Sequence, residues 1–298
     1  MIRAASLTLC VSLWVAPALR AQEESPAGEA EEPDFFFLTG GPYTQKKNSP
    51  QIIWANQWFR HRSPARRTRS YFAAGRFEWG LTDSLEADFE FGALALKERT
   101  SGITTFSGSG ADDLLVGVRY RLLREEFASF TLTLGPQLVA PVASSARREL
   151  GTGEAAYAFD ITAAKDWGGP VFVAASVNLS LTPNVPLVAE GSGPEVDLSS
   201  VDWGAAMGWR ALERPAPQGA LHDIHLLLEL GGARTDTIED GQRTRSTEVL
   251  FAPGMRYGFL SRGGWLAEIG VSFPIGLTPA APDWGVILQV QFEWPGLF

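Results

Sequence analysis

Residues 285–294 read GVILQVQFEW, and in this run the side chains fall alternately on an apolar and a largely polar face. The apolar face carries Val286, Leu288, Val290, Phe292 and Trp294, and the other face carries Gly285, Ile287, Gln289, Gln291 and Glu293. Period-two alternation predicts a β-strand. A glutamate between two aromatic residues is costly against lipid, so the apolar face is expected to contact lipid. Such a strand near the C-terminus is typical of a transmembrane β-barrel, although a soluble sandwich could contain one too.

The same alternation recurs along the chain, separated by turn residues. The candidate strands lie near 51–60, 69–80, 84–96, 113–122, 128–140, 154–165, 170–181, 200–211, 221–233, 246–259, 264–274 and 284–294. Each has about the length that a tilted strand needs to cross a bilayer. Twelve strands predict an all-β, antiparallel, up-and-down transmembrane barrel, expected to be monomeric. The ninth candidate is weaker, because Leu227 interrupts its polar face.

An even strand count places both ends of the barrel in the periplasm. The odd-numbered connections are then external and include Lys97–Ala111, Pro141–Gly153 and Thr182–Ser199, which are long and polar. The even-numbered connections are periplasmic and include Gly80–Asp83, Leu123–Phe127 and Leu260–Gly263, which are short. Long external loops and short periplasmic turns are the expected asymmetry, although Leu212–Ala220 is longer than it favours.

The residues before the first strand predict export. Residues 1–21 resemble a signal peptide, with Arg3 ahead of an apolar stretch that is too short to span a bilayer. Cleavage is expected after Ala21, with Ala18 as the alternative. Residues 22–49 are interpreted as a periplasmic spacer and 50–298 as the barrel. The only cysteine, Cys10, lies in the signal, so the mature chain is expected to lack disulfides. The acidic net charge of −9 argues against nucleic acid as a partner.

Aromatic residues mark the predicted membrane boundary, because Trp and Tyr favour the headgroup region. The girdle at the periplasmic ends is predicted to contain Trp79, Tyr120, Trp209, Tyr257, Trp265 and Trp294. Residues of the opposite parity are expected to line the lumen. The candidates are Arg76, Glu78, Glu86, Asp88, Glu90, Arg119, Arg121, Asp160, Asn178, Asp202, Arg210, Glu229, Arg256, Glu268, Gln289 and Gln291, together with His225. Glu86 and Asp88 are expected to meet Arg119 and Arg121 at similar depth.

Catalytic, metal and cofactor signals are poor, so none of these sites is predicted. His222 and His225 fall on opposite faces of one strand, which prevents them from sharing a metal ion. No serine lies two residues from a histidine in one strand, as a strand-borne hydrolytic pair would need. His61 lies among arginines, where lipopolysaccharide phosphates would be natural counter-charges. Solvated charges explain that cluster equally well.

Five stretches resemble motifs of one protein family, namely Gly80–Glu86 (GLTDSLE), Gly110–Leu114, Gly117–Leu122, Pro253–Tyr257 and Glu268–Val271. The family that they resemble is the outer-membrane family linked to the MetA pathway of phenol degradation. The resemblance implies an outer-membrane transporter, in some members for aromatic compounds, and supplies no catalytic or binding residues. This chain departs from the family pattern in Pro295–Phe298, which follow the last strand.

Together these features predict a passive channel in the outer membrane for small solutes, including aromatic or amphipathic ones. The expected partners are outer-membrane lipid, lipopolysaccharide and the outer-membrane assembly machinery. The lumen charges also allow a barrel filled by its own salt bridges. A non-conducting structural or adhesion-type barrel is therefore the alternative, and an outer-membrane lipid hydrolase is a third possibility.

Overall fold

A computed structural model of the chain describes residues 35–62, 66–100, 103–125, 127–142, 154–187, 194–215, 221–239, 242–261 and 263–294. They belong to one compact unit, Glu32–Phe298. The expected signal peptide, the acidic part of the expected spacer and Pro295–Phe298 lie outside the described residues.

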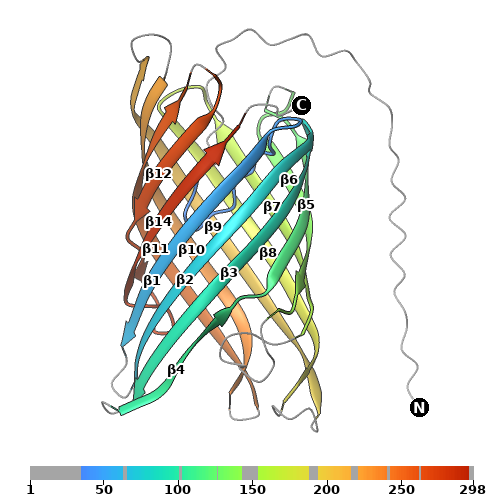
Figure 1. Ribbon diagram of the computed structural model, residues 1–298, viewed down its shortest axis with the longest axis vertical. Helices are drawn as coiled ribbons and strands as arrows, with labels where there is room; N and C mark the ends of the chain where they lie inside the picture. The colour runs from blue at the N-terminus through green and yellow to red at the C-terminus, as the bar shows by residue number, and fades with distance from the viewer. Residues whose placement is uncertain are drawn as a thin grey trace, which may run out of the picture. The chain divides into compact units, whose positions relative to one another are not determined.

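The alternating runs form strands of one sheet that closes on itself (Figure 1). The strands are β1 (Pro50–Arg62), β2 (Arg66–Thr82), β3 (Leu85–Thr100), β4 (Ile103–Ala111), β5 (Leu114–Leu123), β6 (Thr131–Ala140), β7 (Ala156–Asp166), β8 (Val171–Pro186), β9 (Glu195–Pro215), β10 (Leu221–Glu239), β11 (Gln242–Leu260), β12 (Leu266–Ser272), β13 (Ile275–Gly276) and β14 (Trp284–Glu293). Antiparallel pairing of β1 with β14 closes the barrel, with Gln51 opposite Glu293 and Arg60 opposite Trp284.

Two breaks divide what are single strands of the wall. β4 and β5 both pair with β3 and are separated only by Asp112 and Asp113. β12 and β13 both pair with β11 and are separated by Phe273 and Pro274, where a proline cannot donate a ladder hydrogen bond. Counted in this way, the described residues form a closed antiparallel barrel of twelve strands, which confirms the predicted fold class. None of the described segments forms a helix that could span a lipid bilayer.

The two faces of the wall differ as the alternation predicts. The outward face carries large exposed apolar side chains around the ring, including Ile52, Trp54, Phe89, Phe91, Val118, Leu138, Phe159, Leu179, Met207, Leu228, Ile269, Leu288 and Phe292. Burying this belt in lipid removes its apolar surface from water. Each Å² buried contributes about 25 cal/mol of favourable free energy. The inward face buries charged and amide side chains instead. Such an apolar outer belt around a polar interior is the arrangement of outer-membrane barrels.

The two ends of the barrel differ in their connections. We call the end that holds Pro50 and Trp294 the terminal end, drawn at the top of Figure 1, and the opposite end the hairpin end. Short connections, such as 83–84 and 167–170, lie at the terminal end. At the hairpin end, strands continue through much of the stretches expected to be loops. β3 and β4 occupy most of Lys97–Ala111, while β8 and β9 occupy most of Thr182–Ser199, of which residues 188–193 lie outside the described part.

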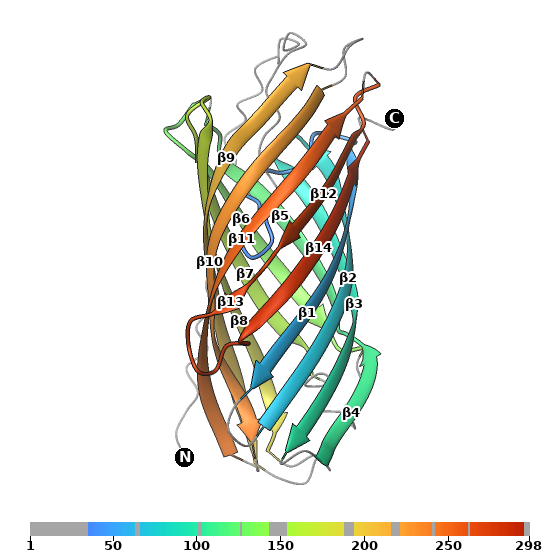
Figure 2. The ribbon, with the colours of Figure 1, turned by 90° about the vertical axis from the view of Figure 1, so that its left-hand side faces the viewer.

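Residues 35–49, which we call the inner segment, run inside the ring of strands (Figures 1 and 2). This placement differs from the expected periplasmic spacer for the part of the spacer that the structure describes. The reason is chemical: Phe35, Phe36 and Phe37 are buried against apolar side chains of the wall, which an extended spacer in water could not achieve. The inner segment therefore forms part of the interior of the barrel.

Candidate functional site

A single lumen carboxylate holds the apolar end of the inner segment. Glu229, on β10, accepts the backbone N–H groups of Phe37, Leu38 and Thr39, each at 2.8 Å. Its side chain is almost fully buried. Three amide donors around one buried carboxylate replace the water that the charge has lost. Glu229 thus links β10 to a segment that precedes it by more than 180 residues.

The middle of the inner segment contacts the opposite part of the wall. Arg121, on β5, donates to the Oγ1 of Thr44 at 3.1 Å and to the Thr44 carbonyl at 2.6 Å. Arg119 donates to the carbonyl of Gly41, and the hydroxyl of Thr133, on β6, donates to the carbonyl of Pro42. The contacts with β5 and with β10 place the segment across the lumen rather than along one strand.

The terminal-end part of the inner segment is fixed by β2, β3 and their turn. The Gln45 N–H donates to Glu86 Oε2 at 2.6 Å, and the Lys47 N–H donates to Asp83 Oδ1 at 3.0 Å. A Cβ at Gly80 would lie 2.0 Å from the carbonyl oxygen of Lys46. Only glycine therefore permits this close approach of the two backbones.

Aromatic side chains of the inner segment form an apolar cluster with the wall. Phe36 packs against Phe172 of β8 with ring centroids 6.1 Å apart. The cluster also contains Phe35, Phe37, Tyr43, Ala164, Ala174, Ala206, Leu227 and Ile287. A Cβ at Gly270 would lie 2.6 Å from the Phe35 ring and 2.7 Å from the Phe37 ring, so this glycine makes room for them. Leu227, which interrupted the polar pattern of its strand, thus faces an apolar neighbour.

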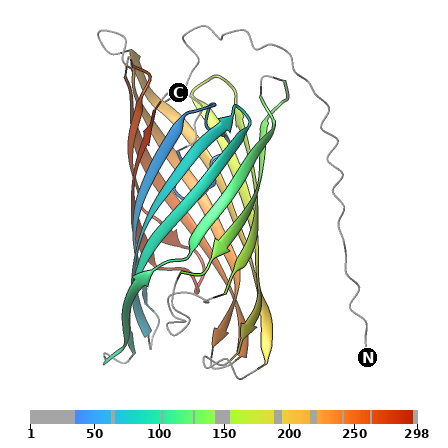
Figure 3. The same ribbon diagram turned by 45° about the vertical axis from the view of Figure 1, so that its right-hand side comes forward.

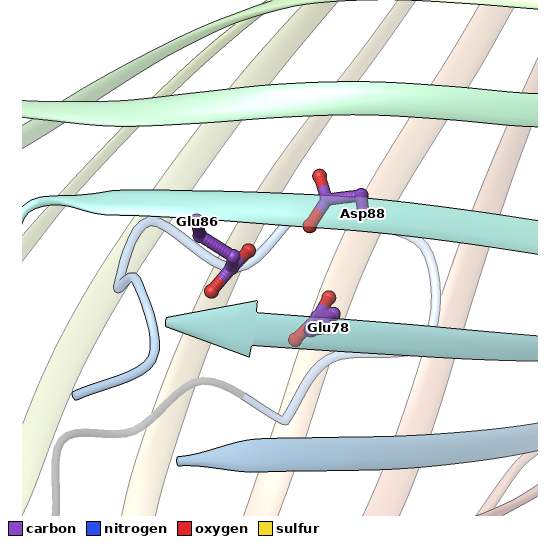
Figure 4. A group of neighbouring side chains, drawn as sticks. All are labelled: Glu78, Glu86 and Asp88. Atoms are coloured by element: carbon purple, nitrogen blue, oxygen red, sulfur yellow. The ribbon is translucent and has the colours of Figure 1, made fainter. Parts of the chain in front are cut away.

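Three carboxylates gather beside the inner segment on β2 and β3. Glu78, Glu86 and Asp88 are all buried, and one oxygen of each lies within 4.8 Å of the others (Figure 4). Two arginines neutralise them: Arg76 lies 3.0 Å from Glu78 and 3.2 Å from Asp88, and Arg119 lies 3.1 Å from Glu86. Carboxylates this close are stable together because guanidinium groups pair with them. We therefore interpret the group as an ion-pair network.

The predicted pairing across β3 and β5 is confirmed for one pair. Glu86 lies directly opposite Arg119 in the register and forms an ion pair with it. Asp88 pairs instead with Arg76 on β2, and Arg121 contacts the inner segment. Asp88 lies opposite Gly117 in the register, so the four residues form one ion pair between β3 and β5.

A second buried network lies between β10, β11 and β12. Arg256 donates to Asp223 Oδ2 at 2.7 Å and to His225 Nδ1 at 3.0 Å, and it also pairs with Glu268. The other ring nitrogen of His225 lies 3.1 Å from Asp223. Within the described residues, the polar partners of His225 are thus an arginine and an aspartate. This arrangement holds the imidazole rigidly and does not resemble a Ser–His pair.

The lumen candidates fall into two groups by burial. The buried ones are Glu78, Glu86, Asp88, Arg119, Arg121, Glu229, Arg256, Glu268, Gln289 and Gln291. The half-buried ones are Arg76, Glu90, Asp160, Asn178, Asp202 and Arg210. Arg210 pairs with Asp166 at the terminal end and lies over the Phe172 ring, 5.0 Å from its centroid. All six girdle candidates, Trp79, Tyr120, Trp209, Tyr257, Trp265 and Trp294, are exposed on the outer face near the terminal end.

Two hollows border the inner segment. One, of about 250 Å³, lies between the segment and β1–β3 and is lined by Ala55, Phe72, Arg76, Glu90 and Gln289, among others. The other, of about 300 Å³, is lined by Leu38 and Gly40 of the segment and by Asp160, Asn178, Asp202, Trp203 and Glu248 of the wall. The half-buried lumen candidates other than Arg210 thus border open space, as do the buried Glu78, Arg119 and Gln289.

Sequence reasoning missed the inner segment as part of the site. Two signals could have indicated it. The run Phe35–Leu38 is apolar and directly follows an acidic stretch. The inward positions Gly204, Gly231, Gly254 and Gly270 lie on four successive strands, and a Cβ at each would meet a residue of the segment. A row of glycines on the inner face of a wall indicates that another backbone approaches closely.

Comparison with known protein families and with curated proteins found no match. Among solved structures, the chain is similar to an outer membrane channel from Pseudomonas putida F1, with 16% identity and a TM-score of 0.55 over 85% of this chain and 97% of that one. It is also similar to the beta domain of the Bordetella autotransporter Brka, with 11% identity and a TM-score of 0.52 over 84% of this chain and 99% of that one. At such low sequence identity, the structural similarity establishes the fold alone, which is that of an outer-membrane β-barrel.

Proposed function

We propose that this protein is an outer-membrane channel for the passive passage of small solutes, closed in the present state by its inner segment. The observation that carries the proposal is how the segment is held. Apart from the peptide bond that joins it to β1, the segment is held by hydrogen bonds to lumen side chains, above all to Glu229. Hydrogen bonds of this kind can be exchanged for water or for solute groups when the segment moves.

The apolar cluster supports aromatic or amphipathic solutes as the substrate class. Phe172, Leu227 and Ile287 of the wall form an apolar surface inside an otherwise polar lumen, and phenyl rings of the segment occupy it. The side chain of Phe36 therefore stands in for an aromatic solute. This agrees with the resemblance to the transporter family linked to the MetA pathway of phenol degradation.

The connections support an orientation with the terminal end in the periplasm. Short turns such as 83–84 lie at that end, whereas extended hairpins such as β8–β9 lie at the other. Outer-membrane barrels place short turns in the periplasm and longer connections outside. In this orientation the inner segment enters the lumen from the periplasmic side, and the hairpin end faces the outside.

A reversible crosslink tests the proposal. A Cβ built at Gly40 would lie 3.5 Å from the Cβ of Ser176, within the range of a disulfide, although the Thr162 methyl at 3.0 Å must move slightly. The double variant Gly40→Cys with Ser176→Cys should lock the segment when oxidised. We expect conductance in planar bilayers to be lost on oxidation and restored on reduction. The single-cysteine variants, which cannot form this bond, are the controls.

The packing of side chains and of the inner segment inside the lumen also favours the alternative, a non-conducting structural or adhesion-type barrel. Ion pairs such as Arg119–Glu86 and the inner segment together occupy much of the interior near the terminal end. That alternative predicts no conductance and no liposome swelling for the wild type, for the reduced double variant or for variants that loosen the segment. This result would lead us to abandon transport. A lipid hydrolase is not favoured, because His225 is engaged by Arg256 and Asp223.

A further inference from the structure

Cations line up across neighbouring strands on the outer face of the barrel, near the hairpin end. Arg60 of β1 lies directly opposite Arg69 of β2, and Arg69 lies directly opposite Lys97 of β3. One step further along, Arg62, Arg67 and Arg99 repeat the arrangement. All six share the parity of the apolar belt, so their side chains project outward and not into the lumen.

Arg60, Arg69 and Lys97, which we call the first row, are not neutralised by the described part of the wall. In the part of the chain that the structure describes, none of Arg60, Arg69 and Lys97 forms an ion pair with a carboxylate. Like charges directly opposite each other on paired strands destabilise a sheet. By contrast, Arg243 and Arg245 on the outside of the same end are both paired with Asp236. The first row therefore lacks the counter-charge that an external anion would supply.

The first row borders a groove in the outer face with a volume of about 1120 Å³. Its lining adds the aromatic side chains Trp58, Tyr71 and Trp284 and the serines Ser107 and Ser109 to Arg60, Arg69 and Lys97. Trp58 and Tyr71 contact each other with ring centroids 5.2 Å apart. β4 borders the groove where it turns away from the barrel (Figures 2 and 3). Cations beside Trp and Tyr side chains are typical of a lipid headgroup boundary.

We propose that this groove binds a phosphorylated glycolipid of the outer leaflet, the lipid A part of lipopolysaccharide. Arg60, Arg69 and Lys97 would hold its phosphates, since guanidinium groups donate two parallel hydrogen bonds to phosphate. Trp58 and Trp284 would contact its sugars at the boundary. Its acyl chains would lie on the belt below, where Trp54 and Phe91 are exposed on the same face. The inference rests on the proposed orientation and not on conduction.

The experiment measures binding of hexa-acylated diphosphoryl lipid A to the purified barrel in detergent, by native mass spectrometry. The test variant carries Arg60→Gln, Arg69→Gln and Lys97→Gln. The matched control carries Arg234→Gln, Arg243→Gln and Arg245→Gln, which removes three exposed cations from β10 and β11 near the same end. We expect the test variant to bind about a hundredfold more weakly and the control to bind like the wild type. Heat-modifiable migration on gels shows that each variant is folded.

Further arms identify the ligand. Dephosphorylated lipid A should bind to the wild type about as weakly as lipid A binds to the test variant. Inorganic pyrophosphate, at the same concentration as lipid A, should not displace lipid A from the wild type. Unchanged binding by the test variant, or an equal loss in the control, would overturn the site. Competition by pyrophosphate would overturn the lipid as ligand. Because binding is measured without a membrane potential, an electrically silent barrel that binds lipid A would contradict only the proposed channel.

Discussion

Glu229 and Phe37 are separated by 192 residues in the sequence, yet the Glu229 carboxylate accepts the Phe37 backbone N–H at 2.8 Å inside the barrel. The same carboxylate also accepts the N–H groups of Leu38 and Thr39. Both oxygens are used, since Oε1 accepts from Phe37 and Oε2 from Leu38 and Thr39, so one carboxylate satisfies three amide donors. The contact joins the last apolar stretch before the barrel to β10 inside the lumen.

Replacing Glu229 with glutamine should loosen the inner segment while leaving the barrel folded. The amide is neutral, so the three donors lose a charged acceptor, and each hydrogen bond to a charge contributes about 1.5–3 kcal/mol. Glutamine also removes the cost of burying a charge in the wall. We expect the open probability in planar bilayers to rise at least tenfold and the barrel's melting temperature not to fall.

Glu248→Gln is the matched control for that change. Glu248 lies on the adjacent strand β11 and borders the hollow next to Leu38 and Gly40. Its substitution removes one lumen carboxylate but none of the contacts that Glu229 makes. An equal rise in open probability for the two variants would mean that lumen charge, and not attachment of the segment, controls opening.

Gly270→Leu should displace the phenyl rings of the inner segment. Even a Cβ at this position would lie within 2.8 Å of both Phe35 and Phe37, and a branched side chain needs more room. The rings are less firmly fixed than the strand and should move first. Hydrogen–deuterium exchange of residues 35–45 should become at least tenfold faster, with the wall strands unchanged. Gly169→Ala, where the added Cβ meets nothing within 4 Å, should leave exchange unchanged.

Arg119→Ala with Arg121→Ala should change ion selectivity. The double change removes the ion pair of Glu86 and the donors to the Gly41 and Thr44 carbonyls. It leaves unneutralised carboxylate at the terminal end of the lumen, which attracts cations and repels anions. The reversal potential in a potassium chloride gradient should shift towards the potassium potential. A shift towards the chloride potential would contradict the placement of these groups along the path.

The fold could be predicted from the sequence because a barrel wall obeys one local rule. In β14 every residue from Val286 to Phe292 faces the side that strict alternation gives it, and the pairing of β1 with β14 follows from closure. Lipid imposes this rule, since each outward position must be apolar over the membrane thickness. Exact strand ends were less predictable. At the hairpin end, ladders continue past the membrane, where neither face is constrained by lipid.

The candidate site was only partly predictable. Parity identified Glu229 as an inward residue, but nothing local to β10 indicates that its partner is backbone N–H from Phe37. That contact is tertiary and joins distant parts of the chain. The inner segment is irregular, so its sequence has no periodicity from which its position could be predicted. What the sequence did contain was a disagreement with the barrel rule, at Leu227 and Ile287, where apolar residues occupy inward positions. Such disagreements deserve a search for whatever covers them.

Thiol labelling of whole cells tests the proposed orientation, on which the lipid A assignment depends. Ala280 lies exposed in the connection between β13 and β14 at the hairpin end, and Ser129 lies exposed in the β5–β6 connection at the terminal end. Cys10 is the only cysteine in the chain and falls in the expected signal peptide, so each new cysteine should be the only thiol of the mature protein. An impermeant maleimide should label Ala280→Cys and spare Ser129→Cys, because the outer membrane excludes the reagent from the periplasm. After the outer membrane is permeabilised, both cysteines should react, which shows that Ser129→Cys is accessible in itself.

Labelling of Ser129→Cys alone on intact cells would mean that the barrel has the opposite orientation. The groove bordered by Arg60 and Arg69 would then face the inner leaflet, and the assignment of its lipid would fail with it.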